Sequence, residues 1–245
     1  SRATDEETRG MPMFRTIVFA AALAGVLAGL LLTVVQRIGT VPLIMQAEVY
    51  EAAGPADPMV AGHDHGAHEQ AWAPQDGLER TLFTGLANVL TGTGFALLLV
   101  AAFALRGREI GWRDGLLWGI AGFAVFTLAP SLGLPPELPG MPAAELGPRQ
   151  AWWLLTAAGT AAGLALLAFR RTPIWALVAV CLIVAPHLVG APQPGITETT
   201  VPEGLAHRFV VAVTVTSFLF WATLGVLSAV IFQRFGRQRE LAPSH

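Results

Sequence analysis

The chain has 245 residues, of which 53% are hydrophobic and only 13% charged, and its formal net charge is −2. Soluble globular domains carry about 25% charged residues, so this composition favours a polytopic membrane protein over a soluble enzyme. The lack of a basic excess excludes a nucleic-acid partner, and the lack of any lysine among the 15 basic residues excludes a P-loop ATPase, whose phosphate loop needs one.

Six segments are apolar and long enough to cross a bilayer core of about 30 Å, which needs roughly 20 helical residues. The fifth segment is the shortest, and Pro186 interrupts its end, so a five-span bundle is the alternative. We predict an all-α, polytopic membrane helical bundle forming a single transmembrane domain over residues 14–235. Its spans are expected at residues 14–36, 81–105, 115–134, 152–169, 173–190 and 209–233.

Polar segments surround these spans. Residues 1–13 are expected to be a polar N-terminal extension, or a remnant ahead of a natural start at Met11 or Met13. Residues 236–245 are expected to be a cytoplasmic tail. The only long loop covers residues 37–80 and contains a histidine-rich stretch.

The arginines predict the orientation, because cytoplasmic loops retain positive charge. In the six-span arrangement, eleven arginines lie on the side of the termini and four on the other. We therefore expect both termini in the cytoplasm and the histidine-rich loop outside. The eleven are Arg2, Arg9, Arg15, Arg106, Arg108, Arg113, Arg170, Arg171, Arg234, Arg237 and Arg239, and the four are Arg37, Arg80, Arg149 and Arg208.

The histidine-rich stretch is the strongest metal-binding signal. His63, His65 and His68 lie within six residues of one another, with Asp64 and Glu69 beside them. Three imidazoles and a carboxylate suffice for a four-coordinate transition-metal site, although histidine tracts also occur in loops that are merely solvated. Ligand type alone leaves cobalt, nickel, copper and zinc open as the divalent ion.

A catalytic zinc site is not expected in this loop. A zinc protease needs His-Glu-x-x-His on a helix, whereas His68 and Glu69 are followed by Trp72 where the second histidine is required. We predict that the chain is not an enzyme.

Two further groups of polar residues are candidates for a route through the membrane. Near the outer helix ends, His187, His207 and Glu203 could receive the ion from the loop, although interfacial histidines also bond to backbone. Within the second span, Asn88, Thr91 and Thr93 could line a pathway, because polar groups are costly in lipid. Interhelical hydrogen bonds are the equally weighted alternative for this second group.

Glycines four residues apart predict close helix packing rather than sites. Such spacing lets helix backbones approach in lipid. Three spans have it, at Gly25 and Gly29, Gly115 and Gly119, and Gly159 and Gly163. Four tryptophans are expected near the membrane interfaces, namely Trp112, Trp118, Trp152 and Trp175.

Several strings in the chain resemble the CbtA family of predicted cobalt transporter subunits. They are Trp72-Ala73-Pro74-Gln75-Asp76-Gly77-Leu78-Glu79-Arg80-Thr81, Asn88 with the glycine-rich run after it, Thr127-Leu128-Ala129-Pro130-Ser131-Leu132-Gly133-Leu134-Pro135, Pro186-His187-Leu188-Val189-Gly190-Ala191-Pro192 and Glu203-Gly204-Leu205-Ala206-His207-Arg208-Phe209. The resemblance covers about residues 14–235. It implies a multi-pass subunit of the bacterial inner membrane with five spans, linked to cobalamin metabolism. It also implies a small single-span, histidine-bearing partner, CbtB.

Together these observations predict a membrane subunit that captures a divalent transition metal, preferably cobalt, at its extracytoplasmic face and passes it across the membrane. An accessory or structural subunit of a larger complex is the alternative, and a copper, nickel or zinc carrier is the nearest alternative of the same class.

Overall fold

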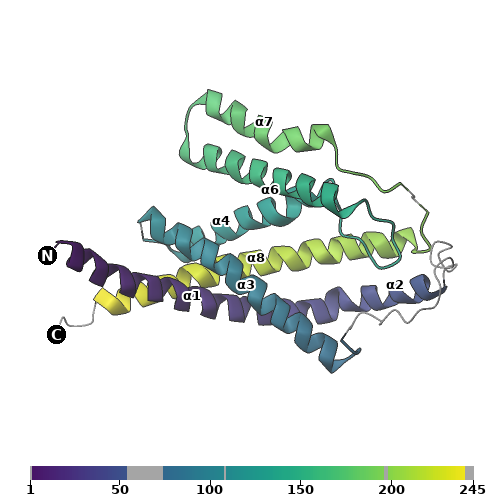
Figure 1. Ribbon diagram of the computed structural model, residues 1–245, viewed down its shortest axis with the longest axis horizontal. Helices are drawn as coiled ribbons and strands as arrows, with labels where there is room; N and C mark the ends of the chain where they lie inside the picture. The colour runs from purple at the N-terminus through teal and green to yellow at the C-terminus, as the bar shows by residue number, and fades with distance from the viewer. Residues whose placement is uncertain (1, 54–73, 108, 196–197, 241–245) are drawn as a thin grey trace.

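The computed structural model describes residues 2–53, 74–107, 109–195 and 198–240, and every regular element in these ranges is helical. Figure 1 shows long helices lying side by side, with the start of α1 and the end of α8 at the same end of the molecule. The elements in chain order are α1 (Arg2–Gly39), α2 (Val41–Ala53), α3 (Leu78–Arg106), α4 (Trp112–Phe123), η1 (Ala124–Leu128), α5 (Ala129–Ser131), α6 (Leu146–Phe169), α7 (Pro173–Val189) and α8 (Glu203–Glu240).

The described residues contain five helical segments that are long and apolar enough to cross a membrane: Met13–Gly39, Leu78–Arg106, Trp112–Ser131, Leu146–Phe169 and Glu203–Arg237. The predicted fifth span is α7, an apolar helix of 17 residues, or about 25 Å at 1.5 Å per residue. Figure 1 shows α7 running back along α6, so six segments alternate in direction and bring the two ends of the chain to one end of the bundle.

The ends of the predicted segments differ from the structure in several places, including the two predicted tails and the long loop. Helix α1 is already helical from Arg2, and α8 continues to Glu240 in the predicted tail. The predicted loop over residues 37–80 begins with a helix, α2, directly after Thr40. A proline at the second position does not disturb this helix, because the first N–H groups of a helix have no partner within it. Leu43 and Ala47, one turn apart, are buried against the start of α8.

Helices α1, α3, α4 and α8 form the main core, with Val100, Phe103 and Leu224 almost completely buried. Two of the predicted glycine seams bring these helices together. A Cβ on Gly29 of α1 would lie 2.6 Å from the Cα of Val89 in α3, and Gly115 and Gly119 of α4 face Gly225 of α8. The packing role predicted for these glycines is confirmed.

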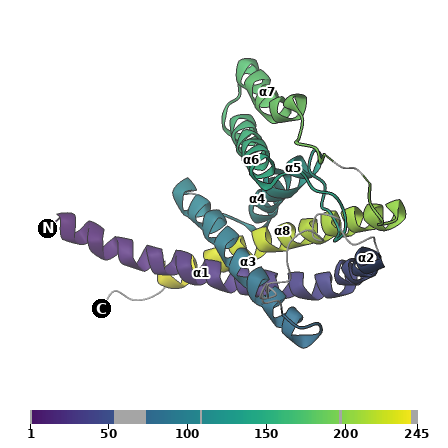
Figure 2. The same ribbon diagram turned by 45° about the vertical axis from the view of Figure 1, so that its right-hand side comes forward.

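Helices α6 and α7 form a hairpin that Figure 2 shows projecting away from α1 and α8. The third glycine seam joins the two. A Cβ on Gly159 would lie 2.6 Å from the carbonyl oxygen of Leu182, and one on Gly163 would lie 2.8 Å from that of Ala179. Pro186 cannot donate to Leu182, one turn earlier, so this seam covers a carbonyl that has lost its helical partner.

The third span is interrupted by a π-helical turn, η1, which ends two residues before Pro130. The N–H of Ala129 donates to the carbonyl oxygen of Ala124, five residues back. Single π turns of this kind are uncommon and frequently lie at functional sites. Here the turn contacts both α6 and α8, so it lies at the junction of the hairpin with the core.

Candidate functional site

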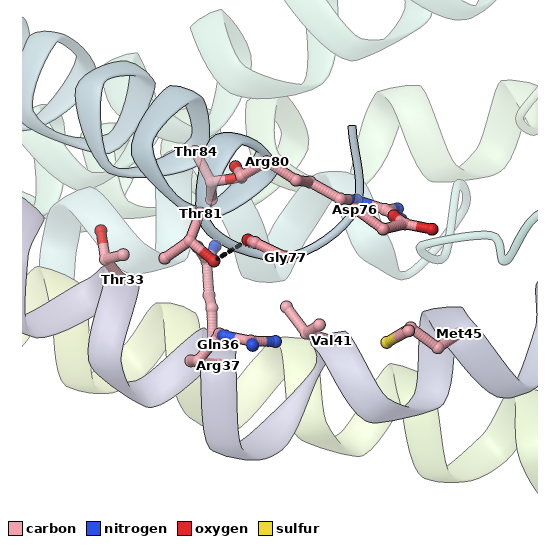
Figure 3. A pocket seen from close by; sticks show the side chains of 10 residues that line it. All are labelled: Thr33, Gln36, Arg37, Val41, Met45, Asp76, Gly77, Arg80, Thr81 and Thr84. Carbon is pink, nitrogen blue, oxygen red and sulfur yellow. Dashed lines mark hydrogen bonds and ion pairs between the residues drawn. The ribbon is translucent and has the colours of Figure 1, made fainter. Parts of the chain in front are cut away.

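A cavity of about 110 Å³, whose wall is mostly apolar in area but includes several polar side chains, lies where α1 passes into α2 and α3 begins, at the end of the bundle predicted to be extracytoplasmic. Figure 3 shows side chains from all three segments around it. Its polar lining consists of Thr33, Gln36, Arg37, Asp76, Arg80, Thr81 and Thr84.

Asn88 lies beside this cavity and joins α3 to α1. Its Nδ2 donates to the hydroxyl oxygen of Thr33 at 3.0 Å and to the side-chain oxygen of Gln36 at 2.7 Å. Thr33 in turn donates to the carbonyl oxygen of Gly29 at 2.8 Å. Among the described residues, no hydrogen bond to the Oδ1 of Asn88 is found. The interhelical hydrogen-bond interpretation of Asn88 is therefore confirmed, and it leaves one ligand atom unused.

Arg80 forms two ion pairs at the outer side of the cavity. Its guanidinium lies 2.7 Å from Glu48 of α2 and 2.9 Å from Asp76, just before α3. The contact with Glu48 joins α2 to the first turn of α3, whereas the contact with Asp76 stays within the turn into α3. The charged residues that line the cavity are Arg37, Asp76 and Arg80, and Arg80 is also paired with Glu48, which lies outside the lining. Hydroxyl and amide oxygens are weaker ligands than imidazole for a late first-row metal, so this lining is suited to weak, transient contact with such an ion rather than tight binding.

The turn into α3 depends on Gly77. Its φ of 101° lies in a region that side-chain-bearing residues rarely adopt. The hydroxyl of Thr81 donates to its carbonyl oxygen at 2.7 Å, as Figure 3 shows. The α3 N-cap has no side-chain hydrogen bond, and Glu79 instead accepts from the N–H of Gln75 at 3.1 Å.

His187 lies near the end of α7, half-buried, with its ring 5.6 Å from that of Trp152 in an edge-to-face arrangement. The indole N–H of Trp152 donates to the carbonyl oxygen of Pro186 at 3.0 Å. Trp152, expected at the membrane interface, is only 6% exposed, because this bond and the packing on Gly133 draw it inward. His187 is thus positioned by a neighbouring helix.

His207 and Glu203 both lie exposed in the first turns of α8. Over the ranges that the structure describes, no three His, Cys, Asp or Glu side chains are arranged to hold one metal ion. His187, His207 and Glu203 are therefore not brought together as a common site here. The five loop candidates, His63, Asp64, His65, His68 and Glu69, lie outside the described residues.

The other two predicted pathway residues differ in environment. Thr91 is exposed, whereas Thr93 is half-buried against Gly25 of α1. The α1–α3 seam is thus close-packed at Thr93 against Gly25 and at Asn88 against Gly29, and the cavity lies beyond Asn88, toward the start of α3.

Sequence reasoning missed the contribution of the first helix. Thr33 and Gln36 lie three residues apart near the end of the first span, a spacing that puts two polar groups on one helix face. Glu48 could not be identified in the same way, because its partner Arg80 is 32 residues away in the sequence.

Comparison with known proteins gives one family. The family described as probable cobalt transporter subunit (CbtA) matches residues 14–233. Neither the curated proteins nor the solved structures contain a match.

Proposed function

Since the chain belongs to the CbtA family of probable cobalt transporter subunits, we propose that it captures a divalent transition metal, with cobalt preferred, at its extracytoplasmic face and passes it across the membrane. The observation that carries the proposal is the cavity beside Asn88. There the α1–α3 seam carries hydroxyl and amide side chains next to the close-packed Gly29.

In this proposal the histidine-rich stretch collects the ion. Imidazole nitrogen binds late first-row divalent metals better than hydroxyl or amide oxygen does, so His63, His65 and His68, with Asp64 or Glu69, would supply affinity. His187, His207 and Glu203 would then receive the ion at the outer helix ends. The cavity would accept it only transiently.

Passage inward would require the α1–α3 seam to open below Asn88. Thr93 lies against Gly25 at the next level and is the next polar group along the seam. The hydroxyl and amide groups of the cavity can break their hydrogen bonds to one another and bind an ion or water instead. The α1–α3 seam is therefore the proposed route. Thr91, on the exposed surface, would contribute least.

A partner is expected to complete the site. The family description calls these proteins subunits, and the described residues lack three ligands for one ion. A small single-span, histidine-bearing protein of the CbtB type would supply imidazole where this chain has oxygen. The bacterial inner membrane is the proposed location, with the histidine-rich loop on the periplasmic side.

The experiment is cobalt uptake into liposomes that contain the purified protein, with and without the partner subunit, at limiting external cobalt. Replacing His63, His65 and His68 together by alanine should lower uptake at least about tenfold. We expect the three ligands together to contribute more than about 1.4 kcal/mol of binding free energy, which corresponds to a tenfold change in affinity. Three alanines at Pro55, Pro58 and Gln70 in the same loop are the matched control and should leave uptake unchanged. Equal uptake by both triple variants would contradict capture by these histidines.

A second comparison tests the receiving position. His187→Ala should lower uptake more than His65→Ala, since the loop has spare histidines and the outer helix ends have few. Folding of His187→Ala is checked by its elution profile, because the contact with Trp152 is lost as well. If the two single variants transport equally well, His187 has no receiving role.

The accessory-subunit alternative has one observation in its favour, the missing ligand cluster within the described residues. An accessory subunit would bind metal at its histidine-rich loop without moving it into the lumen. Liposomes that accumulate no cobalt, with or without the partner, while the protein still binds cobalt would favour this alternative.

A further inference from the structure

A second, larger cavity lies at the opposite end of the bundle, between the core and the hairpin. Its volume is about 450 Å³, and α3, α4, η1, α6 and α8 all contribute to its walls. Its floor is an aromatic cluster in which the rings of Phe126 and Trp221 are stacked 5.4 Å apart and Phe95 lies 4.9 Å from Phe126. The α6 wall is lined by three alanines, Ala161, Ala165 and Ala168, together with Leu164 and Phe169. We call this cavity the membrane groove.

Among the described residues, one charged residue lines the membrane groove. Arg106, in the last turn of α3, lies at its mouth and is exposed. Over the described ranges no carboxylate pairs with it, since the three ion pairs found there use Arg80 and Arg149. The groove therefore combines an apolar interior with an uncompensated positive charge at its mouth.

Residues typical of the lipid headgroup region lie at the same end of the bundle. The guanidinium of Arg113 lies 5.3 Å from the Trp112 ring, and that of Arg170 lies 5.7 Å from the Trp175 ring. Tryptophan and arginine are enriched at the boundary between lipid and water. The mouth of the groove is thus at the depth of lipid phosphates, and its interior extends toward the hydrocarbon.

We infer that the membrane groove binds one phospholipid, with an acyl chain on the aromatic floor and the phosphate at Arg106. The volume favours a chain over a helix, since a span 30 Å long and 10 Å wide would occupy about 2,400 Å³. Charge favours the same occupant, because the phosphate neutralises Arg106 while the chain meets only apolar side chains. The bound lipid would fill the space that otherwise separates α6 from α3, and so join the hairpin to the core.

The inference is tested by native mass spectrometry of the full-length protein in mild detergent, titrated with phosphatidylglycerol and, separately, phosphatidylethanolamine. The wild type should retain one phospholipid of either kind, since both carry the phosphate. Ala165→Leu fills the groove and should abolish this adduct, and Ala162→Leu, on an exposed position of α6 outside the groove, should keep it. Arg106→Gln should weaken binding about fivefold, as expected for one arginine at a membrane surface. Arg171→Gln, at the same end of the bundle, should not.

The inference is overturned if Ala165→Leu and Ala162→Leu retain the same adduct, or if Arg106→Gln binds as the wild type does. Ala161→Leu is a second filling variant, which decides the matter if Ala165→Leu does not fold. A wild-type protein that holds no phospholipid but forms dimers that Ala165→Leu dissociates would also overturn it, since a second copy would then occupy the groove. Cobalt uptake plays no part in these readouts, so the result is independent of the proposed transport function.

Discussion

The α1–α3 and α4–α8 interfaces are both packed on glycines, but they differ in the side chains beyond those glycines. In both, glycines bring two helix backbones into contact, at Gly29 against Val89 and at Gly225 against Gly119. Toward the outer end, the α1–α3 interface carries the hydrogen-bonded side chains of Asn88, Thr33 and Gln36 beside a cavity. The α4–α8 interface continues into a close-packed set of rings around Trp221.

The difference has a physical consequence for movement. A glycine and aromatic interface has one good packing arrangement, and any separation loses contacts that nothing replaces. A polar interface can exchange its hydrogen bonds for others of similar energy, with water or an ion. We therefore expect α1 and α3 to separate during function while α4 and α8 remain together.

The largest effect is expected at the fixed interface. In Gly225→Ala the new Cβ would lie 2.8 Å from the backbone of Gly119, and such overpacking should cost about 3 kcal/mol of unfolding free energy. Chemical denaturation in detergent measures this cost. Gly94→Ala, which has open space around it, is the matched control and should change stability little. The protein that remains folded in Gly225→Ala should transport normally, and loss of its specific uptake would show that α4–α8 is not a passive scaffold.

At the polar interface we expect a smaller effect on stability and a larger effect on cobalt uptake. Asn88→Leu removes two interhelical hydrogen bonds, which should cost about 1 kcal/mol, since such bonds in membranes average about 0.6 kcal/mol each. Uptake per folded molecule should nevertheless fall strongly, because the Oδ1 is lost. Thr91→Val, exposed on the same helix, is the control. If uptake falls only in proportion to the folded fraction, Asn88 is purely structural.

The smallest effect is expected where the polar interface meets solvent. Arg80→Ala should lower the unfolding free energy by only about 0.5 kcal/mol, because its partners are partly exposed and such ion pairs contribute little. Hydrogen exchange in residues 41–53 should nevertheless become faster, since Arg80 joins Glu48 of α2 to α3. Arg149→Ala, which breaks a comparable pair with Glu137, should leave exchange in α2 unchanged. Identical exchange in both variants would show that Arg80 does not hold α2.

The spans and the three glycine seams could be predicted because hydrophobic length and four-residue spacing are local properties of the sequence. Helix α2 could not, since it is short and follows a polar end of α1, and its apolar residues are recognisable only once Leu138 and the start of α8 pack on them. The π turn could not be predicted from the sequence either. Pro130 indicates a disturbed helix, but it does not indicate how the extra residue is accommodated.

The candidate site was predicted in part. Asn88 was identified because a polar side chain in an apolar span needs a partner, but its partners Thr33 and Gln36 depend on how α1 is rotated against α3. The grouping of His187 with His207 rested on similar depth, and depth does not determine position around the bundle. Figures 1 and 2 both show the end of α7 well separated from the start of α8.

The π turn at Ala124–Leu128 affects how positions in the third span should be counted. One residue more per turn offsets every side chain after it by about 100° from the regular α-helical course. Spin labels or paired cysteines chosen by counting across this turn from Gly115 to Ser131 would therefore face the wrong neighbour. Distance measurements on this span need reference positions on each side of the turn, and their mismatch with a straight helix would report the turn directly.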